Sequence, residues 1–129
     1  MKLLLDTHIW YWSLVDPAHL GRRVRNELTK VQNELWLSPV STWEILLLNS
    51  KGRIRLRENP SEWIAQATAN LHEAPLTHEI VLAAHHLPLL HFDPADRFLA
   101  ATAEVLDLTL VTADGRLLGL GDIKTLANR

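Results

Sequence analysis

Hydrophobic and polar positions alternate along the chain in blocks that suit strands and helices in turn. Short apolar runs mark five candidate strands, at 2–5, 35–37, 73–76, 108–112 and 122–126. The segments between them predict helices at 7–14, 20–31, 40–49, 60–71, 77–87 and 93–106, with a small further helix near 115–118. Strands that alternate with helices predict an α/β fold around a mainly parallel sheet.

Composition narrows the class of protein. The chain has 129 residues, of which 47% are hydrophobic, and this is enough for one domain over 1–129 with a real core. It contains no cysteine, so disulfides and thiolate metal sites are excluded and a cytoplasmic location is expected. No apolar run reaches the length of a membrane span or signal peptide, and a net charge of −2 argues against a generally basic nucleic-acid coat.

Four acidic residues lie where such a fold places its ligand site. Asp6 closes the first apolar run and Asp114 follows the run at 108–112, so both belong to carboxyl ends of strands, beyond which open parallel sheets bind ligands. Glu44 and Asp96 lie near the starts of two expected helices. Together they could form an all-oxygen site.

Each acid also has an ordinary explanation as a helix cap. Ser41 and Glu44 match a capping box, Asp93 suits an N-cap that leaves Asp96 free, and Asp6 and Asp114 could be cap or turn residues. Capping does not explain why two strand ends and two helix starts that the topology brings together all carry acids. We therefore favour a shared site.

Clustered carboxylates predict a bound cation. At an effective dielectric near 20, each close pair of like charges costs on the order of several kcal/mol. A hard divalent ion offsets this repulsion, and Mg²⁺ or Mn²⁺ suits carboxylate oxygens. Such an ion lowers the pKa of a bound water and stabilises charge on a phosphodiester, so the chemistry expected is phosphodiester hydrolysis.

Four segments carry a resemblance to a known family. They are Leu3-Leu4-Leu5-Asp6-Thr7-His8, Ser41-Thr42-Trp43-Glu44-Ile45, Asp93-Pro94-Ala95-Asp96-Arg97-Phe98-Leu99-Ala100-Ala101-Thr102-Ala103 and Thr109-Leu110-Val111-Thr112-Ala113-Asp114. In this order they resemble PIN-domain ribonucleases, especially the VapC-like toxins of bacterial toxin–antitoxin pairs. The resemblance implies a PIN-like three-layer fold with a sheet of four or five strands flanked by helices, and a metal-dependent endoribonuclease that acts on RNA, is inhibited by a small antitoxin protein and forms a homodimer.

The resemblance also assigns roles to residues. Asp6 and Asp96 would be the principal metal ligands, Asp114 and Glu44 would complete the pocket, and Thr7 and Thr112 would be supporting hydroxyls. No acid follows Asp114 until Asp122, so we do not expect a fifth ligand from that stretch.

Basic and aromatic residues suggest further contacts. Six arginines fall in two groups that could form a phosphate-binding rim for RNA, although a solvated charged face explains them equally well: Arg22, Arg23, Arg25, Arg53, Arg55 and Arg57. Arg97 fits a structural ion pair at least as well as a phosphate contact. Tryptophans on helices that are apolar on most faces, such as Trp43, indicate a core or subunit contact.

Two other functions remain open. A strand-end aspartate followed by threonine also occurs in aspartyl-phosphate phosphotransferases and receivers, although His8 stands where one such group carries a second aspartate. A non-catalytic PIN-like binding module is the other alternative.

Overall fold

A five-stranded sheet forms the centre of the computed structural model, which describes residues 1–57, 59–88, 93–120 and 122–129. The strands are β1 (Lys2–Leu5), β2 (Glu34–Leu37), β3 (His72–Glu73), β4 (Thr109–Thr112) and β5 (Thr125–Ala127). Their order in the sheet is β3-β2-β1-β4-β5, and every neighbouring pair is parallel. The carboxyl ends of all strands therefore open at the same edge.

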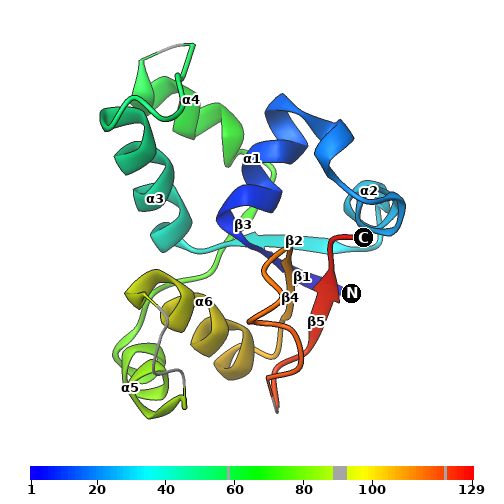
Figure 1. Cartoon of the computed structure of the whole chain (residues 1–129), viewed down its shortest axis with the longest axis vertical. Coiled ribbons are helices and arrows are strands. Elements are labelled where there is room, and N and C mark those ends of the chain that lie inside the picture. The colour runs from blue at the N-terminus through cyan, green and yellow to red at the C-terminus, as the bar shows by residue number, and fades with distance from the viewer. Residues whose placement is uncertain (58, 89–92, 121) are drawn as a thin grey trace.

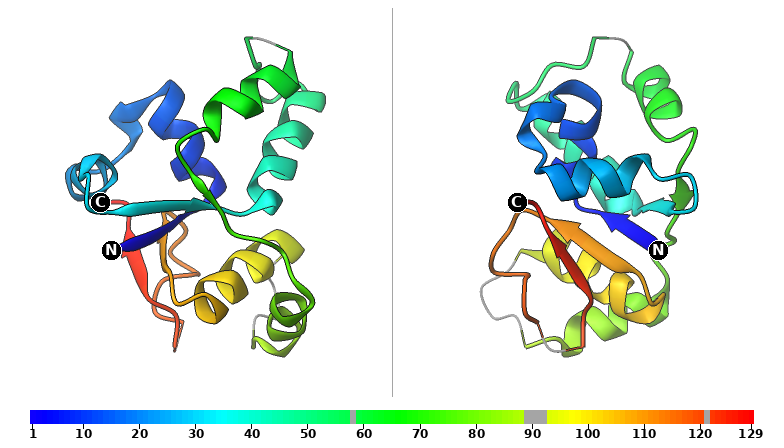
Figure 2. Two further views of the ribbon diagram at one scale, coloured as in Figure 1. Left: turned by 180° about the vertical axis from the view of Figure 1, so that it is seen from behind. Right: turned by 90° about the vertical axis from the view of Figure 1, so that its right-hand side faces the viewer.

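Helices cover both faces of this sheet (Figure 1). One face packs against α1 (Thr7–Val15), α2 (Arg22–Thr29), α3 (Pro39–Ser50) and α4 (Pro60–Ala67), and the other against α5 (His78–His86) and α6 (Pro94–Val105). A 3-10 turn, η1 (Pro17–His19), connects α1 to α2. Figure 2 shows the resulting three layers from two further directions, which confirms the predicted architecture.

The central strand β1 explains why the apolar runs are continuous. Leu3 and Leu5 join the cluster under α1 and α3, whereas Leu4 points to the opposite face and joins the cluster under α6. Because both faces are covered, Leu3 and Leu4 are fully buried, as is typical of parallel sheets. The register pairs Leu5 with Val111, which sets the residues that follow β1 and β4 beside each other.

The structure corrects some expected boundaries. The expected helix at 60–71 ends at Ala67, and the strand expected at 122–126 lies at Thr125–Ala127. No helix forms at 115–118: the Asp114 side chain accepts the backbone N–H of Arg116 as a helix cap would, but the stretch continues as turns up to Gly119, which has a φ of 77°. None of the helices in the described ranges is long and apolar enough to cross a membrane.

Candidate active site

One cavity of about 420 Å³ at the carboxyl edge of the sheet collects all four acids that the sequence singled out. Asp6 and Asp114 come from the ends of β1 and β4, Glu44 from α3 and Asp96 from α6. The remaining lining residues are His8, Trp12, Asp93, Ala113 and Arg116. The expectation that these distant acids meet is correct.

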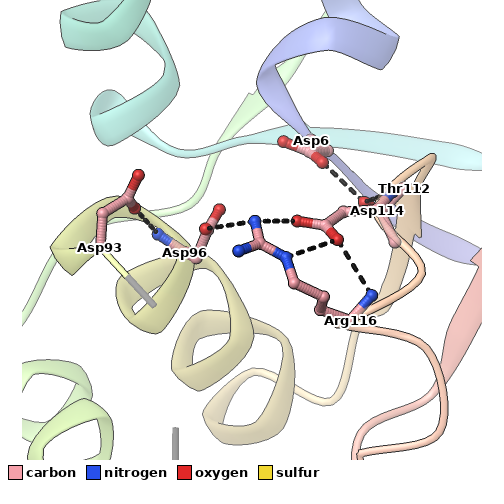
Figure 3. Close-up of polar contacts among 6 residues, drawn as sticks. All are labelled: Asp6, Asp93, Asp96, Thr112, Asp114 and Arg116. Atoms are coloured by element: carbon pink, nitrogen blue, oxygen red, sulfur yellow. Dashed lines mark hydrogen bonds and ion pairs between the residues drawn. The ribbon is translucent and has the colours of Figure 1, made fainter. Parts of the chain in front are cut away.

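Asp6 is fixed from two directions. It is the N-cap of α1 and accepts a hydrogen bond of 2.6 Å from the Thr7 backbone N–H. Its second oxygen accepts one of 2.6 Å from Thr112 Oγ1 of β4, as Figure 3 shows. Burial raises the pKa of Asp6, and the two hydrogen bonds counteract part of that rise. The Asp6 side chain therefore caps α1 and also lines the cavity.

Glu44 is held by Thr7 rather than by a capping box. Thr7 Oγ1 donates a hydrogen bond of 2.5 Å to Glu44 Oε1 and lies 2.9 Å from Ser41 Oγ. The N-cap of α3 is Ser38, whose hydroxyl accepts from the Val40 N–H, so Ser41 lies inside the helix and the capping-box interpretation is wrong. Burial is the main cause that raises the pKa of Glu44. The glutamate side chain reaches the cavity instead of the helix terminus.

Asp93 and Asp96 have different roles at the start of α6. Asp93 caps the helix by accepting the backbone N–H of Asp96 at 2.9 Å, which leaves the Asp96 carboxylate to face the cavity, as expected (Figure 3). Burial, followed by the charges of Asp93, Asp6, Asp114 and Glu44, raises the pKa of Asp96 to about 7. Asp93 is thus a fifth acid of the cavity, although only a capping role was predicted for it.

Arg116 also lines the cavity and was not among the predicted site residues. Its Nε and Nη2 donate to the two oxygens of Asp114 at 3.1 and 2.8 Å, and Nη2 lies 3.8 Å from Asp96 Oδ2 (Figure 3). These hydrogen bonds hold the pKa of Asp114 below its usual range. The available signal was the Asp-x-Arg spacing after a strand, which lets a turn fold the arginine back onto the acid.

The chemical type of the oxygen atoms in this cavity suits a hard divalent cation. All of its candidate ligands are carboxylate oxygens, and a bound cation would offset the burial and the neighbouring negative charges that raise the pKa of Asp96. No group of three or more acidic or histidine side chains among the described residues is drawn together tightly enough to form a finished metal site. Arg116 lies between two of the carboxylates instead.

The other predicted contacts lie elsewhere. Arg97 Nη1 donates to the carbonyls of Ala84 and Leu87, at 2.9 and 3.2 Å, which ties α6 to the end of α5. None of the six arginines proposed as an RNA rim appears among the described residues that line the cavity. Figure 1 places the group on α2 and the group between α3 and α4 on different parts of the molecule, so they do not form one patch.

The chain is similar to known proteins over most of its length. The family model of the PIN domain matches residues 3–122. Ribonuclease VapC22 of Mycobacterium tuberculosis is 31% identical over 116 residues, which cover 89% of this chain and 88% of that protein.

Solved structures show the same fold at lower identity. VapBC2 from Rickettsia felis, bound to a DNA fragment from its promoter, matches with a TM-score of 0.75 and 17% identity, covering 98% of both chains. A toxin–antitoxin complex from Klebsiella pneumoniae matches with a TM-score of 0.68 and 18% identity, again over 98% of both chains.

Proposed function

The chain belongs to the PIN-domain family, and from that premise we propose that it is a metal-dependent endoribonuclease, the toxin of a toxin–antitoxin pair. The observation that carries the proposal is the meeting of Asp6, Glu44, Asp96 and Asp114 at one cavity, although they come from four separate elements. The relative that is 31% identical is itself a ribonuclease, which supports hydrolysis of RNA phosphodiester bonds.

We assign the metal to the acids of this cavity. Asp6 and Asp96 would be the principal ligands of Mg²⁺ or Mn²⁺, with Asp114 and Glu44 completing the set. When bound, the ion would neutralise charge on the scissile phosphate and acidify the attacking water. Asp96 must be ionised for this role, and its raised pKa makes that ionisation depend on pH near neutrality.

The supporting residues orient these acids. Thr112 Oγ1 and the Thr7 N–H hold the two oxygens of Asp6, and Thr7 Oγ1 holds Glu44. Each held oxygen keeps a second lone pair for a ligand. Thr7 thereby contacts two carboxylates, Asp6 and Glu44, the second of which lies 37 positions after Thr7 in the chain, and it orients both without any bound ion or substrate.

Partners follow from the same premise. We propose a small antitoxin protein as inhibitor, because the matched structures include toxin–antitoxin complexes. We also propose a homodimer through the apolar surface that α3, α6 and the segment before α5 form next to the acids. On this surface Trp43 is 63% exposed, and Leu47 and Leu76 are 37% and 41% exposed. The proposal treats residues 1–129 as a single PIN-like domain that acts in the cytoplasm, where its RNA substrate is found.

Cleavage of RNA by the purified chain tests this function. Protein freed of any partner should cut RNA when Mg²⁺ or Mn²⁺ is added, and Asp96→Asn should abolish cutting while circular dichroism shows an intact fold. Covalent labelling of Asp6 by a small phosphodonor, without RNA cleavage, would instead support the aspartyl-phosphate alternative. Wild-type protein that binds RNA but leaves it intact with either metal would support the non-catalytic module.

A further inference from the structure

The guanidinium of Arg116 lies between two acids that line the cavity, Asp96 and Asp114. Its Nε and Nη2 donate to both oxygens of Asp114, and Nη2 also approaches Asp96 Oδ2 at 3.8 Å. Figure 3 shows the side chain reaching back from the turn after β4 to lie between these two carboxylates. The arginine therefore bridges an acid from a strand end and an acid from a helix start.

Charge explains why an arginine takes this position. Five acids line the cavity, and Arg116 is the only lysine or arginine among the described lining residues. A guanidinium between Asp96 and Asp114 reduces their mutual repulsion and satisfies oxygens that would otherwise face each other. Arg116 thereby supplies part of the positive charge that we propose a divalent cation provides.

The same oxygens cannot serve both cations fully. If Asp96 and Asp114 coordinate a metal, the Arg116 side-chain hydrogen bonds to Asp114 and its ion pair with Asp96 must lengthen or break, because two cations would compete for the same oxygens. Solvent can reach this pair, because the Arg116 side chain is 62% exposed, so water can replace its hydrogen bonds to Asp114 when the guanidinium moves away.

The backbone keeps the displaced side chain nearby. The Arg116 N–H donates to Asp114 Oδ1 at 2.9 Å, so the residue stays tethered to the rim of the cavity when its guanidinium leaves. The planar guanidinium that now donates two hydrogen bonds to the Asp114 carboxylate can donate two to a phosphate in the same way. A phosphate of RNA held at the neighbouring metal would lie within reach of such a side chain.

We propose that Arg116 is a positioning residue that competes with the divalent cation for Asp96 and Asp114 and, once displaced, binds a phosphate of the RNA substrate. This inference rests on the proposed function. Without metal, Arg116 supplies positive charge next to Asp96 and Asp114. With metal bound, its guanidinium would orient the RNA substrate.

Calorimetric titration of the full chain with Mn²⁺, without RNA, tests the competition. Loss of the competing charge in Arg116→Gln should tighten Mn²⁺ binding by about three- to tenfold, and Arg116→Lys should fall between this variant and wild type. Lys124→Gln is the matched control, because Lys124 is also an exposed cation paired with an aspartate, Asp107, but outside the cavity. Its Mn²⁺ affinity should equal that of wild type. Unchanged or weaker Mn²⁺ binding by Arg116→Gln overturns the proposal.

Cleavage at saturating Mn²⁺ tests the second role. Arg116→Gln should raise KM for RNA by about tenfold with a smaller effect on kcat, and Arg116→Lys should recover part of the loss. An unchanged KM overturns the proposal even if Mn²⁺ binds more tightly. A chain whose Mn²⁺ affinity responds to Arg116→Gln as expected, yet which cuts no RNA in any form, contradicts the proposed function while the competition at the site stands.

Discussion

Replacing Asp96 by asparagine should make the metal-free protein more stable at pH 8. The Asp96 side chain is 18% exposed and carries a pKa of about 7 instead of 3.8, so the folded state binds its proton more tightly than the unfolded state does. A carboxyl with a raised pKa lowers the free energy of unfolding as pH rises from about 4 to about 7, and the full loss is present above pH 7. Asparagine has no charge to bury and escapes this loss.

The size of the gain follows from the pKa shift. Each pKa unit corresponds to about 1.4 kcal/mol, so the whole shift would give about 4 kcal/mol. Partial exposure and the nearby Arg116 screen the charge, and an acid in the first turn of α6 also gains from the helix dipole. We therefore expect Asp96→Asn to raise the free energy of unfolding by about 1 to 3 kcal/mol at pH 8.

Thermal unfolding in EDTA measures this effect. Asp96→Asn should melt about 3 to 10 °C above wild type at pH 8, and the difference should shrink at pH 5, where wild-type Asp96 is mostly protonated. Asp107→Asn is the control, since Asp107 is an aspartate outside the cavity, 80% exposed and paired with Lys124, and should give no gain. Melting of Asp96→Asn at or below the wild-type temperature at pH 8 would refute the argument that burial and the neighbouring acids make a charged Asp96 destabilising.

Three further results are expected. Asp6→Asn should abolish metal-dependent RNA cleavage but stabilise the metal-free protein less than Asp96→Asn does, because Asp6 already accepts hydrogen bonds from Thr7 and Thr112; a larger rise in melting temperature would count against this. Thr7→Val should lower the free energy of unfolding by about 1 to 3 kcal/mol, since it leaves Glu44 without its hydroxyl partner, whereas Thr7→Ser should retain most of the stability in urea titrations. Affinity for Mn²⁺ should rise with pH by up to about tenfold per unit below the Asp96 pKa of about 7, because the ion must displace the Asp96 proton, and should level off above it. An affinity that calorimetry finds constant from pH 5.5 to 8 would exclude Asp96 as a ligand.

The sequence predicted the fold well where local pattern and burial agree. Continuous apolar runs identify β1 and β4 because both are covered on two faces, and Asp93-Pro94 marks the start of α6 because it combines an N-cap with proline at the first helical position. The stretch at 115–118 was predicted wrongly as a helix. The Asp114 side chain does accept a backbone N–H as at a helix start, but the chain then turns and reaches a positive φ at Gly119, which hydrophobic periodicity does not report.

The site was predictable only in part. Strand ends in a parallel sheet share an edge, so the meeting of Asp6 with Asp114 follows from topology alone. The environment of Glu44 could not be foreseen, because a capping box at Ser41 and a site residue give the same local sequence, and only the placement of the cap at Ser38 separates them. Arg116 was missed because its role depends on how a turn folds back.

The pairing of β1 with β4 has a consequence for how the molecule is made. Thr112 bonds to Asp6 across 106 positions, and Asp96 and Asp114 also come from the last third of the chain. During translation, the N-terminal part emerges first and long-range contacts wait for their partners. A ribosome therefore releases the second half of the acid pocket only near the end of synthesis. A product terminated just before β4 would carry Asp6, Glu44 and Asp96 but would lack Asp114, Thr112 and the strand that pairs with β1. It could not assemble the centre, so incomplete chains would be harmless to the RNA around them.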